Sequence, residues 1–177
     1  MKKLLLSVSI LAAISACGKR EAEPTIDFGP NTGITQRDDS NQPYGTLDPT
    51  DWTADETWTK QEQKLFTVPV DLSVPSPRSI QPRGLFPNPI TSKRHGAFGF
   101  YGIPFGAMWQ MVFVDKNYKV VERLEYGPFQ VSDVLFGFEF PADKFTPNTI
   151  YRMYYILYTK SPATLHLKGH GDIQISM

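Results

Sequence analysis

The second half of this chain alternates large apolar residues with other residues at a period of two. Between 133 and 140, valine and phenylalanine occupy every second position, and 108–114 and 151–157 repeat the pattern. Successive side chains of an extended strand point to opposite faces, so this period is typical of β-strands. Together with the intervening turn residues, it predicts strands near 78–84, 96–102, 107–114, 118–125, 130–140, 149–158 and 163–176.

Seven short strands within 67–177 match the size of an immunoglobulin-like domain. We therefore expect an all-β fold: an immunoglobulin-like antiparallel β-sandwich of about seven strands. The single cysteine, Cys17, leaves no partner for an intramolecular disulfide, so the core must supply the stability. An aromatic content of 13% can supply such a core.

The heptapeptide 145–151 reads Phe-Thr-Pro-Asn-Thr-Ile-Tyr. It closely resembles the corner before the sixth strand of fibronectin type III-like domains, with phenylalanine in the usual place of leucine. The resemblance implies a structural corner formed by Pro147, Thr149 and Tyr151, in which the tyrosine hydroxyl bonds back to the corner backbone. Trp109 is the candidate for the tryptophan that such domains carry on the third strand.

The N-terminus carries a separate signal. Two lysines precede the apolar run 4–13, which is too short to span a bilayer, and small residues precede Cys17. This segment resembles the lipobox of bacterial lipoproteins, which are cut before the cysteine and lipidated on it. The resemblance implies a signal peptide over 1–16, lipidation of Cys17 and a location in the cell envelope, at the outer membrane, on either side. The alternatives are an inert buried thiol and a plain cleaved signal peptide.

A second, weaker resemblance covers 86–177. The sequence Leu-Phe-Pro-Asn-Pro at 85–89, with the sandwich-like stretch after it, is similar to the start of type IX secretion sorting domains. The chain departs from that family in its lipobox and in lacking a basic C-terminal strand. We take the similarity to imply a shared fold rather than a sorting function.

Two segments lie between the signal and the strands. Residues 18–50 are poor in large apolar side chains, so 17–50 is predicted to be a lipidated N-terminus and flexible tether. The alternative is an extended coil packed along the domain. In 51–66, Thr53 and Thr59 are each followed three positions later by glutamate, as in a capping box. With apolar residues at helical spacing, 51–66 predicts a short amphipathic helix.

Charge excludes one class of partner. The chain has 18 basic and 18 acidic residues. Removing 1–16 removes two lysines and no acid, which leaves no basic face to neutralise phosphates, so we expect no nucleic-acid partner. Beyond the signal, no run of 18 apolar residues predicts a transmembrane helix.

Candidate chemistry is sparse. In an extended strand, His166, His170 and Asp172 would share one face, as in a metal site, but Gly169 and Gly171 predict a bulge that breaks the alignment. No serine lies in a nucleophile motif, and there is no glycine-rich phosphate loop. We therefore expect no catalytic residues, no metal and no cofactor.

A binding surface is the better prediction. The aromatic stretch 98–109 contains a glycine-flanked apolar loop tip at 102–106. The strand at 149–158 is apolar on both faces, so either 52–66 or another protein should cover one side of its sheet. The candidate partner-binding residues are Trp52, Trp58, Ile103, Phe105, Tyr154 and Tyr158.

Three functions remain open from the sequence. The leading hypothesis is a non-enzymatic outer-membrane lipoprotein that acts as an accessory or stabilising subunit of a membrane protein assembly. The first alternative is a surface-exposed adhesion or glycan-binding lipoprotein with tryptophan and tyrosine as stacking platforms. The second is a metal-dependent enzyme that uses His166, His170 and Asp172.

Overall fold

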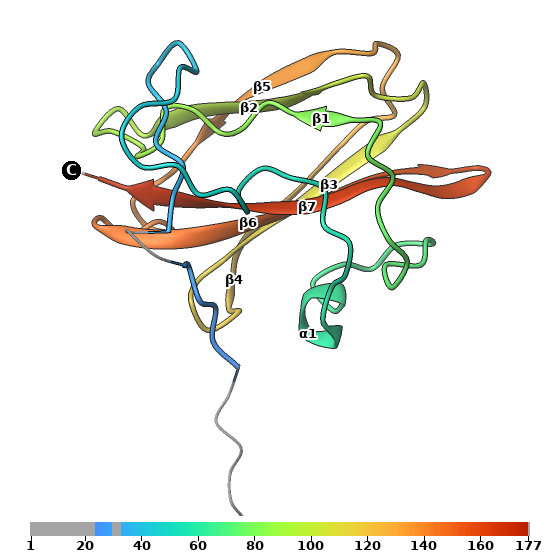
Figure 1. The fold of residues 1–177 in the computed structure, drawn as a ribbon, viewed down its shortest axis with the longest axis horizontal. Coiled ribbons are helices and arrows are strands. Elements are labelled where there is room, and N and C mark those ends of the chain that lie inside the picture. Colours follow the sequence, from blue (N-terminus) through green and yellow to red (C-terminus); the bar gives the residue numbers. More distant parts are fainter. Residues whose placement is uncertain (1–23, 30–32, 177) are drawn as a thin grey trace, which may run out of the picture.

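The computed structural model describes residues 24–29 and 33–176, so Cys17 and the signal segment lie outside the described residues. The described residues form one short helix and seven strands (Figure 1). The helix is α1 (Lys60–Gln63). The strands are β1 (Gln81–Pro82), β2 (His95–Tyr101), β3 (Met108–Val114), β4 (Val120–Tyr126), β5 (Val134–Glu139), β6 (Thr149–Lys160) and β7 (Ala163–Ile175).

The strands form two antiparallel sheets. One has three strands in the order β1-β2-β5, and the other has four in the order β4-β3-β6-β7. Figure 1 shows the three-stranded sheet above the four-stranded sheet, with α1 on the far side of the latter. The prediction of an all-β sandwich of about seven strands is confirmed.

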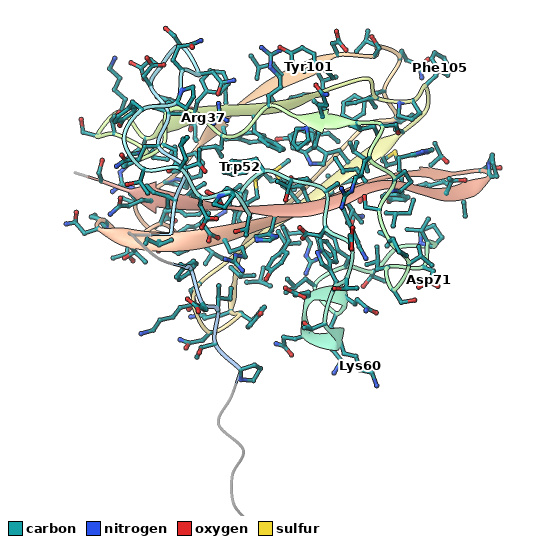
Figure 2. The ribbon with its side chains drawn as sticks, viewed as in Figure 1. Arg37, Trp52, Lys60, Asp71, Tyr101 and Phe105 are labelled. Carbon is teal, nitrogen blue, oxygen red and sulfur yellow. The ribbon has the colours of Figure 1, made fainter. Side chains whose placement is uncertain are left out.

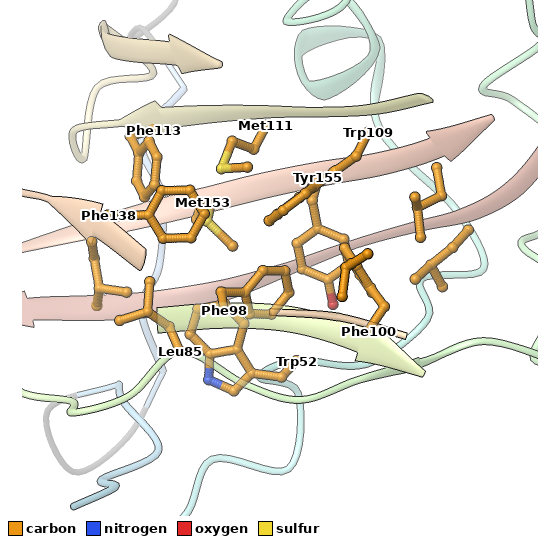
Figure 3. Packing of buried hydrophobic residues seen from close by; sticks show 14 of the residues in the cluster. Trp52, Leu85, Phe98, Phe100, Trp109, Met111, Phe113, Phe138, Met153 and Tyr155 are labelled. Atoms are coloured by element: carbon orange, nitrogen blue, oxygen red, sulfur yellow. The ribbon is translucent and has the colours of Figure 1, made fainter. Parts of the chain in front are cut away.

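Aromatic residues make up nearly half of the buried cluster that fills the space between the sheets (Figure 3). Trp109, on the third strand as expected, is fully buried and contacts Phe98 and Phe100 with ring centroids 5.6 and 5.0 Å apart. The alternation read from the sequence places these rings on one face of each strand, and the two faces meet here. The core is therefore the direct consequence of the period of two.

β6 is buried on both faces. Its inner residues, such as Tyr155, face the core, while Tyr154, Ile156 and Tyr158 belong to a second apolar cluster on the outside of the sheet. Trp58, Leu65, Phe66 and Leu72 cover this second cluster. The sequence left open whether residues 52–66 or another protein covers this face of the sheet, and the structure shows that residues of the chain itself do so.

The predicted helix at 51–66 is wrong in extent. Only Lys60–Gln63 is helical, and only the second capping box forms: the Thr59 side chain accepts from the Glu62 N–H, and the Glu62 carboxylate accepts from the Thr59 N–H. Residues 51–58 are instead a non-helical strap that begins in a turn, and the N–H groups of Trp52 and Asp55 bond to carbonyls of β7 at 2.8 and 2.9 Å. Below, "the strap" denotes residues 51–66.

The predicted tether is also corrected for the described residues from 33 onward. Ile34 is fully buried, and the Thr35 N–H donates to the Asp51 carboxylate at 2.7 Å. Arg37 exchanges two backbone hydrogen bonds with Asn88. The stretch is poor in apolar residues, as the sequence indicated, but polar contacts hold it against the sandwich. The alternative prediction, an extended coil packed along the domain, is therefore the one observed.

The corner before β6 has the geometry that the resemblance implied. The Tyr151 hydroxyl accepts a hydrogen bond from the Thr146 N–H at 2.8 Å, and the Tyr151 ring packs against Phe145 with centroids 5.2 Å apart. Thr149 donates its hydroxyl to the Pro147 carbonyl. These contacts fix the turn that starts the longest strand pair, β6 and β7.

The outer edge of β7 is sealed by side chains and loops. The N–H groups of Lys168, Asp172 and Gln174 donate to Ser76 Oγ, Asp51 Oδ1 and Asn88 Oδ1 at 3.0, 2.8 and 3.1 Å. Carbonyls along the same edge accept from the strap, from the Asn88 amide and from the Ile90 N–H. An edge strand that would otherwise be free to pair with another chain is thereby closed.

Candidate functional site

Five of the six predicted partner-binding residues are not available at the surface. Trp52, Trp58, Ile103, Tyr154 and Tyr158 are all buried within the described chain. The strap supplies two of them: Trp52 enters the inter-sheet core beside Gly171, and Trp58 packs edge-on against Tyr154 with centroids 5.6 Å apart. Ile103 instead belongs to the core between the sheets. The prediction that these five meet a partner is therefore corrected.

The sixth residue, Phe105, is the most exposed large apolar side chain of the described chain, at 74%. It lies at the tip of the β2–β3 loop, at the periphery of the molecule, whereas Trp52 lies inside it (Figure 2). The loop turns at Gly102 and Gly106, whose φ angles are +76° and +77°. Glycine adopts these positive angles without the steric cost that a side chain would bring.

The backbone around Phe105 is held firmly. Ile103 is buried, and its N–H donates to the Ser132 carbonyl at 2.7 Å. The Gly106 N–H donates to the Phe129 carbonyl at 2.8 Å, and the Phe129 N–H donates to Ala107 at 2.9 Å. The loop therefore presents the phenylalanine ring from a fixed base, which lowers the entropy cost of burying it against a partner.

Phe105 also borders a cavity of about 470 Å³ at this end of the sandwich. Met108 and Pro128 add apolar surface to the cavity, and Thr159, Lys160 and Ser161 form its polar side. Lys160 pairs with Glu125 at 3.5 Å, and both side chains are largely exposed. An apolar anchor beside a concave, polar-rimmed surface is the usual anatomy of a protein-binding site.

This loop end is opposite to the end at which the N-terminal segment joins the sandwich. The Ile26 N–H donates to the Lys116 carbonyl at 2.8 Å, just after the last residue of β3. Phe105 lies just before the first residue of the same strand. Seven extended residues span about 23 Å, which separates the two ends.

His166, His170 and Asp172 do not form a metal site. Asp172 makes a two-point ion pair with Arg152, with Oδ1–Nε and Oδ2–Nη2 distances of 2.7 Å each. His166 contacts the Thr159 hydroxyl instead. The bulge predicted at Gly169 and Gly171 is not there: β7 pairs continuously with β6 from 167 to 175, and the register shift falls at His166. Among the described residues, no group of three such side chains is placed to hold a metal ion.

The structure reveals a pair that the sequence did not indicate. His170 Nδ1 lies 2.8 Å from Asp55 Oδ2, which also accepts the Trp58 indole N–H at 2.6 Å. Beside it, Glu62 accepts a hydrogen bond from the Tyr154 hydroxyl at 3.0 Å. Asp55, Trp58, Glu62 and His170 border a cavity of about 330 Å³ between the strap and β7. Nothing in the spacing could have found the pair, because its members are 115 residues apart.

Asp51 in the strap and His170 on β7 both have raised pKa values. Burial, with the nearby charge of Asp172, raises the pKa of Asp51 to about 7, although its two backbone hydrogen bonds oppose the shift. Burial lowers the pKa of His170, but the hydrogen bond and charge of Asp55 outweigh it, so the pKa is raised. Both groups therefore couple the stability of the fold to protonation.

Comparison with protein-family models, with curated proteins and with solved structures gives no match to this chain. Within the described residues, no helix has both the length and the apolar character needed to cross a bilayer.

Proposed function

We propose that this protein is a non-enzymatic outer-membrane lipoprotein, anchored through lipid on Cys17, that acts as an accessory or stabilising subunit of a membrane protein assembly. The N-terminal resemblance to lipoproteins supports the anchor. The partner is another protein of the cell envelope, and it docks at the end of the sandwich that carries Phe105.

One observation carries this proposal: Phe105 is 74% exposed on a loop that is otherwise tied down by backbone hydrogen bonds. Transfer of a phenylalanine side chain from water into an apolar pocket contributes about 1.5–3 kcal/mol. Within the folded chain, exposure of this ring forgoes that free energy, whereas a partner with an apolar pocket would recover it. The position of the ring, at the end away from residue 26, also suits a protein that is held to a membrane by its N-terminus and contacts a partner beyond it.

The test is affinity purification of the full-length protein in mild detergent, followed by mass spectrometry of the proteins that remain bound. Phe105→Ser should reduce recovery of the stoichiometric partner about 10- to 100-fold, because it removes the apolar anchor. Leu47→Ser is the matched control, since Leu47 is 60% exposed in the N-terminal segment, outside the Phe105 loop and its cavity. Equal recovery with both variants would contradict the proposed surface.

The cavity beside His170 supports a second candidate, a ligand-binding lipoprotein. Glu62 and Asp55 supply acceptors there and protonated His170 supplies a donor, a combination that suits a hydroxylated ligand such as a glycan. The tryptophans are not its stacking platforms, because Trp52, Trp58 and Trp109 are all buried. Saturable glycan binding that is lost in His170→Ala, together with purification of the protein alone, would favour this candidate over the first.

A further inference from the structure

The outer edge of β5 is unpaired. In its sheet β5 neighbours only β2, and Phe140, which continues its register, donates its N–H to the Arg94 carbonyl at 2.9 Å. Antiparallel pairing alternates, so the backbone groups of Leu135, Gly137 and Glu139 point away from β2. In the part of the chain that the structure describes, no other segment bonds to these three residues.

The two edges of the four-stranded sheet are protected and this one is not. β7 is sealed from Lys168 to Gln174 by the contacts described above. β4 carries Glu122, Arg123 and Glu125, and Arg123 bonds to the Leu65 carbonyl of the strap. Within 134–139 the only charge is Glu139, at the end, and β5 has no proline and no register shift against β2. Proteins usually block such an edge with charge, proline or a bulge.

Apolar side chains surround this open edge. Leu135 is 47% exposed, Val131 in the preceding loop is 57% exposed, and Phe136 is only partly buried. Gly137 has open space at its Cβ position, with no atom within 4 Å, and its φ is not in the left-handed region. Neither steric crowding nor backbone conformation within the described chain requires glycine at this position, so a side chain can be introduced there without disturbing the fold.

We propose that β5 pairs antiparallel with β5 of a second copy of this chain, about a two-fold axis at Gly137. The strand is self-complementary in this register because the sequence around the axis reads Phe-Gly-Phe. Leu135 then lies opposite Glu139 of the other copy, and Phe136 opposite Phe138. The three outward residues of each copy form three hydrogen-bonded pairs, about six interchain hydrogen bonds in all.

The same register places the aromatic side chains of the two copies opposite each other. Phe136 and Phe138 face the core side of their sheet, where Phe136 already stacks on Tyr126 with centroids 4.7 Å apart. Cross-strand aromatic pairs stabilise antiparallel strands, and here two such pairs form symmetrically across the axis. The two three-stranded sheets become one continuous six-stranded sheet. An identical partner satisfies the edge because a two-fold interface requires only that one patch complement itself.

The test uses the full-length protein in detergent with cysteine introduced at the axis. Hydrogen-bonded antiparallel pairs hold Cα atoms about 5.5 Å apart, within the range that a disulfide bridges. Gly137→Cys should therefore form a covalent dimer under a mild oxidant about tenfold faster than Val120→Cys, a control on exposed β4. The unaltered chain, oxidised in parallel, measures any linkage through Cys17.

A second variant tests the same pairing without a crosslink. Gly137→Lys places a charge on the edge where the Cβ has free space, so it should convert a dimer in sedimentation velocity to a folded monomer. A monomeric unaltered protein with no preference for linkage at position 137 over 120 would overturn the proposal. Faster linkage of Gly137→Cys to a different envelope protein than to itself would also overturn it. Because Phe105 lies outside β5, either result leaves the proposed docking surface to be judged separately.

Discussion

Asp51 Oδ1 accepts a hydrogen bond from the backbone N–H of Asp172 at 2.8 Å, which joins residues 121 positions apart. The other carboxylate oxygen accepts from the Thr35 N–H at 2.7 Å. One buried side chain of the strap therefore ties the N-terminal segment to the edge of the last strand. Burial first, and then the charge of Asp172, raise the pKa of this carboxyl to about 7.

The raised pKa of Asp51 makes stability depend on pH. The folded chain holds a proton on Asp51 up to about pH 7, whereas the ordinary value is 3.8. The free energy of unfolding should therefore fall as the pH rises from about 4 to 7, by at most about 1.4 kcal/mol per unit, and level off above. Urea unfolding at several pH values measures the slope. Asp51→Asn should reduce it, and an identical slope in the variant would contradict this assignment.

The Asp55–His170 pair adds a second pH dependence in a different range. Its stabilisation should be fully present below about pH 6.5, the ordinary value for histidine, and should be lost as the pH rises through the raised pKa of His170. Asp55→Asn should therefore destabilise the protein by about 1–3 kcal/mol at pH 6 and by less at pH 9. Urea unfolding of both proteins at the two pH values is the measurement. An equal loss at both would mean that the ion pair contributes nothing.

The strands and the corner could be predicted from the sequence because they depend on local patterns. Alternation at 133–140 and 149–158 placed β5 and β6 to within a few residues, and the seven residues up to Tyr151 contained the whole corner contact. Because both faces of β6 are apolar, the sequence also predicted correctly that its outer face is covered. These features need no knowledge of which distant segments meet.

The strap could not be predicted, because its contacts are polar and distant in sequence. In the sequence, Asp51 and Asp55 resemble ordinary acidic residues of an exposed loop, and only the fold shows that their partners lie on β7. Gly169 and Gly171 looked like a bulge, yet they lie in regular register: a Cβ at Gly169 would meet the Thr53 carbonyl, and one at Gly171 the Trp52 ring. Of the predicted site, only Phe105 remained at the surface, where its flanking glycines had indicated a loop tip.

Tyr151→Phe should lower the free energy of unfolding by about 1–3 kcal/mol, because the Thr146 N–H loses its acceptor in a partly buried corner. Chemical denaturation of the two proteins side by side measures the loss. Tyr44→Phe is a suitable control, since Tyr44 is half exposed on the N-terminal segment. No difference between Tyr151→Phe and the unaltered protein would remove the corner as a source of stability.

Asn88→Ala should cost more, about 3 kcal/mol or greater, because it leaves several buried groups without partners. The Asn88 amide donates to the carbonyls of Thr35 and Asp172 at 3.1 and 2.9 Å, and its oxygen accepts from the Gln174 N–H. Hydrogen exchange should show faster exchange along the outer edge of β7 in this variant. Exposed Asn117→Ala is the control. A loss no larger than that control would contradict the edge-sealing role.

Cys17→Ser should release the protein from membranes, because the proposed anchor is lipid on that side chain. Fractionation of cells that express either form, followed by a high-salt wash, measures the distribution. If the serine variant stays in the washed membrane fraction as completely as the unaltered protein, lipid is not the anchor, and the proposed attachment is wrong.

The docking surface is the central claim, and crosslinking in intact cells tests it most directly. A photoreactive phenylalanine analogue at position 105 should give one discrete crosslinked product with an envelope protein, because the ring at that position contacts the partner. The same analogue at exposed position 47 should give none. Crosslinking from 105 only to water and lipid, with the protein otherwise folded and membrane-bound, would contradict the account.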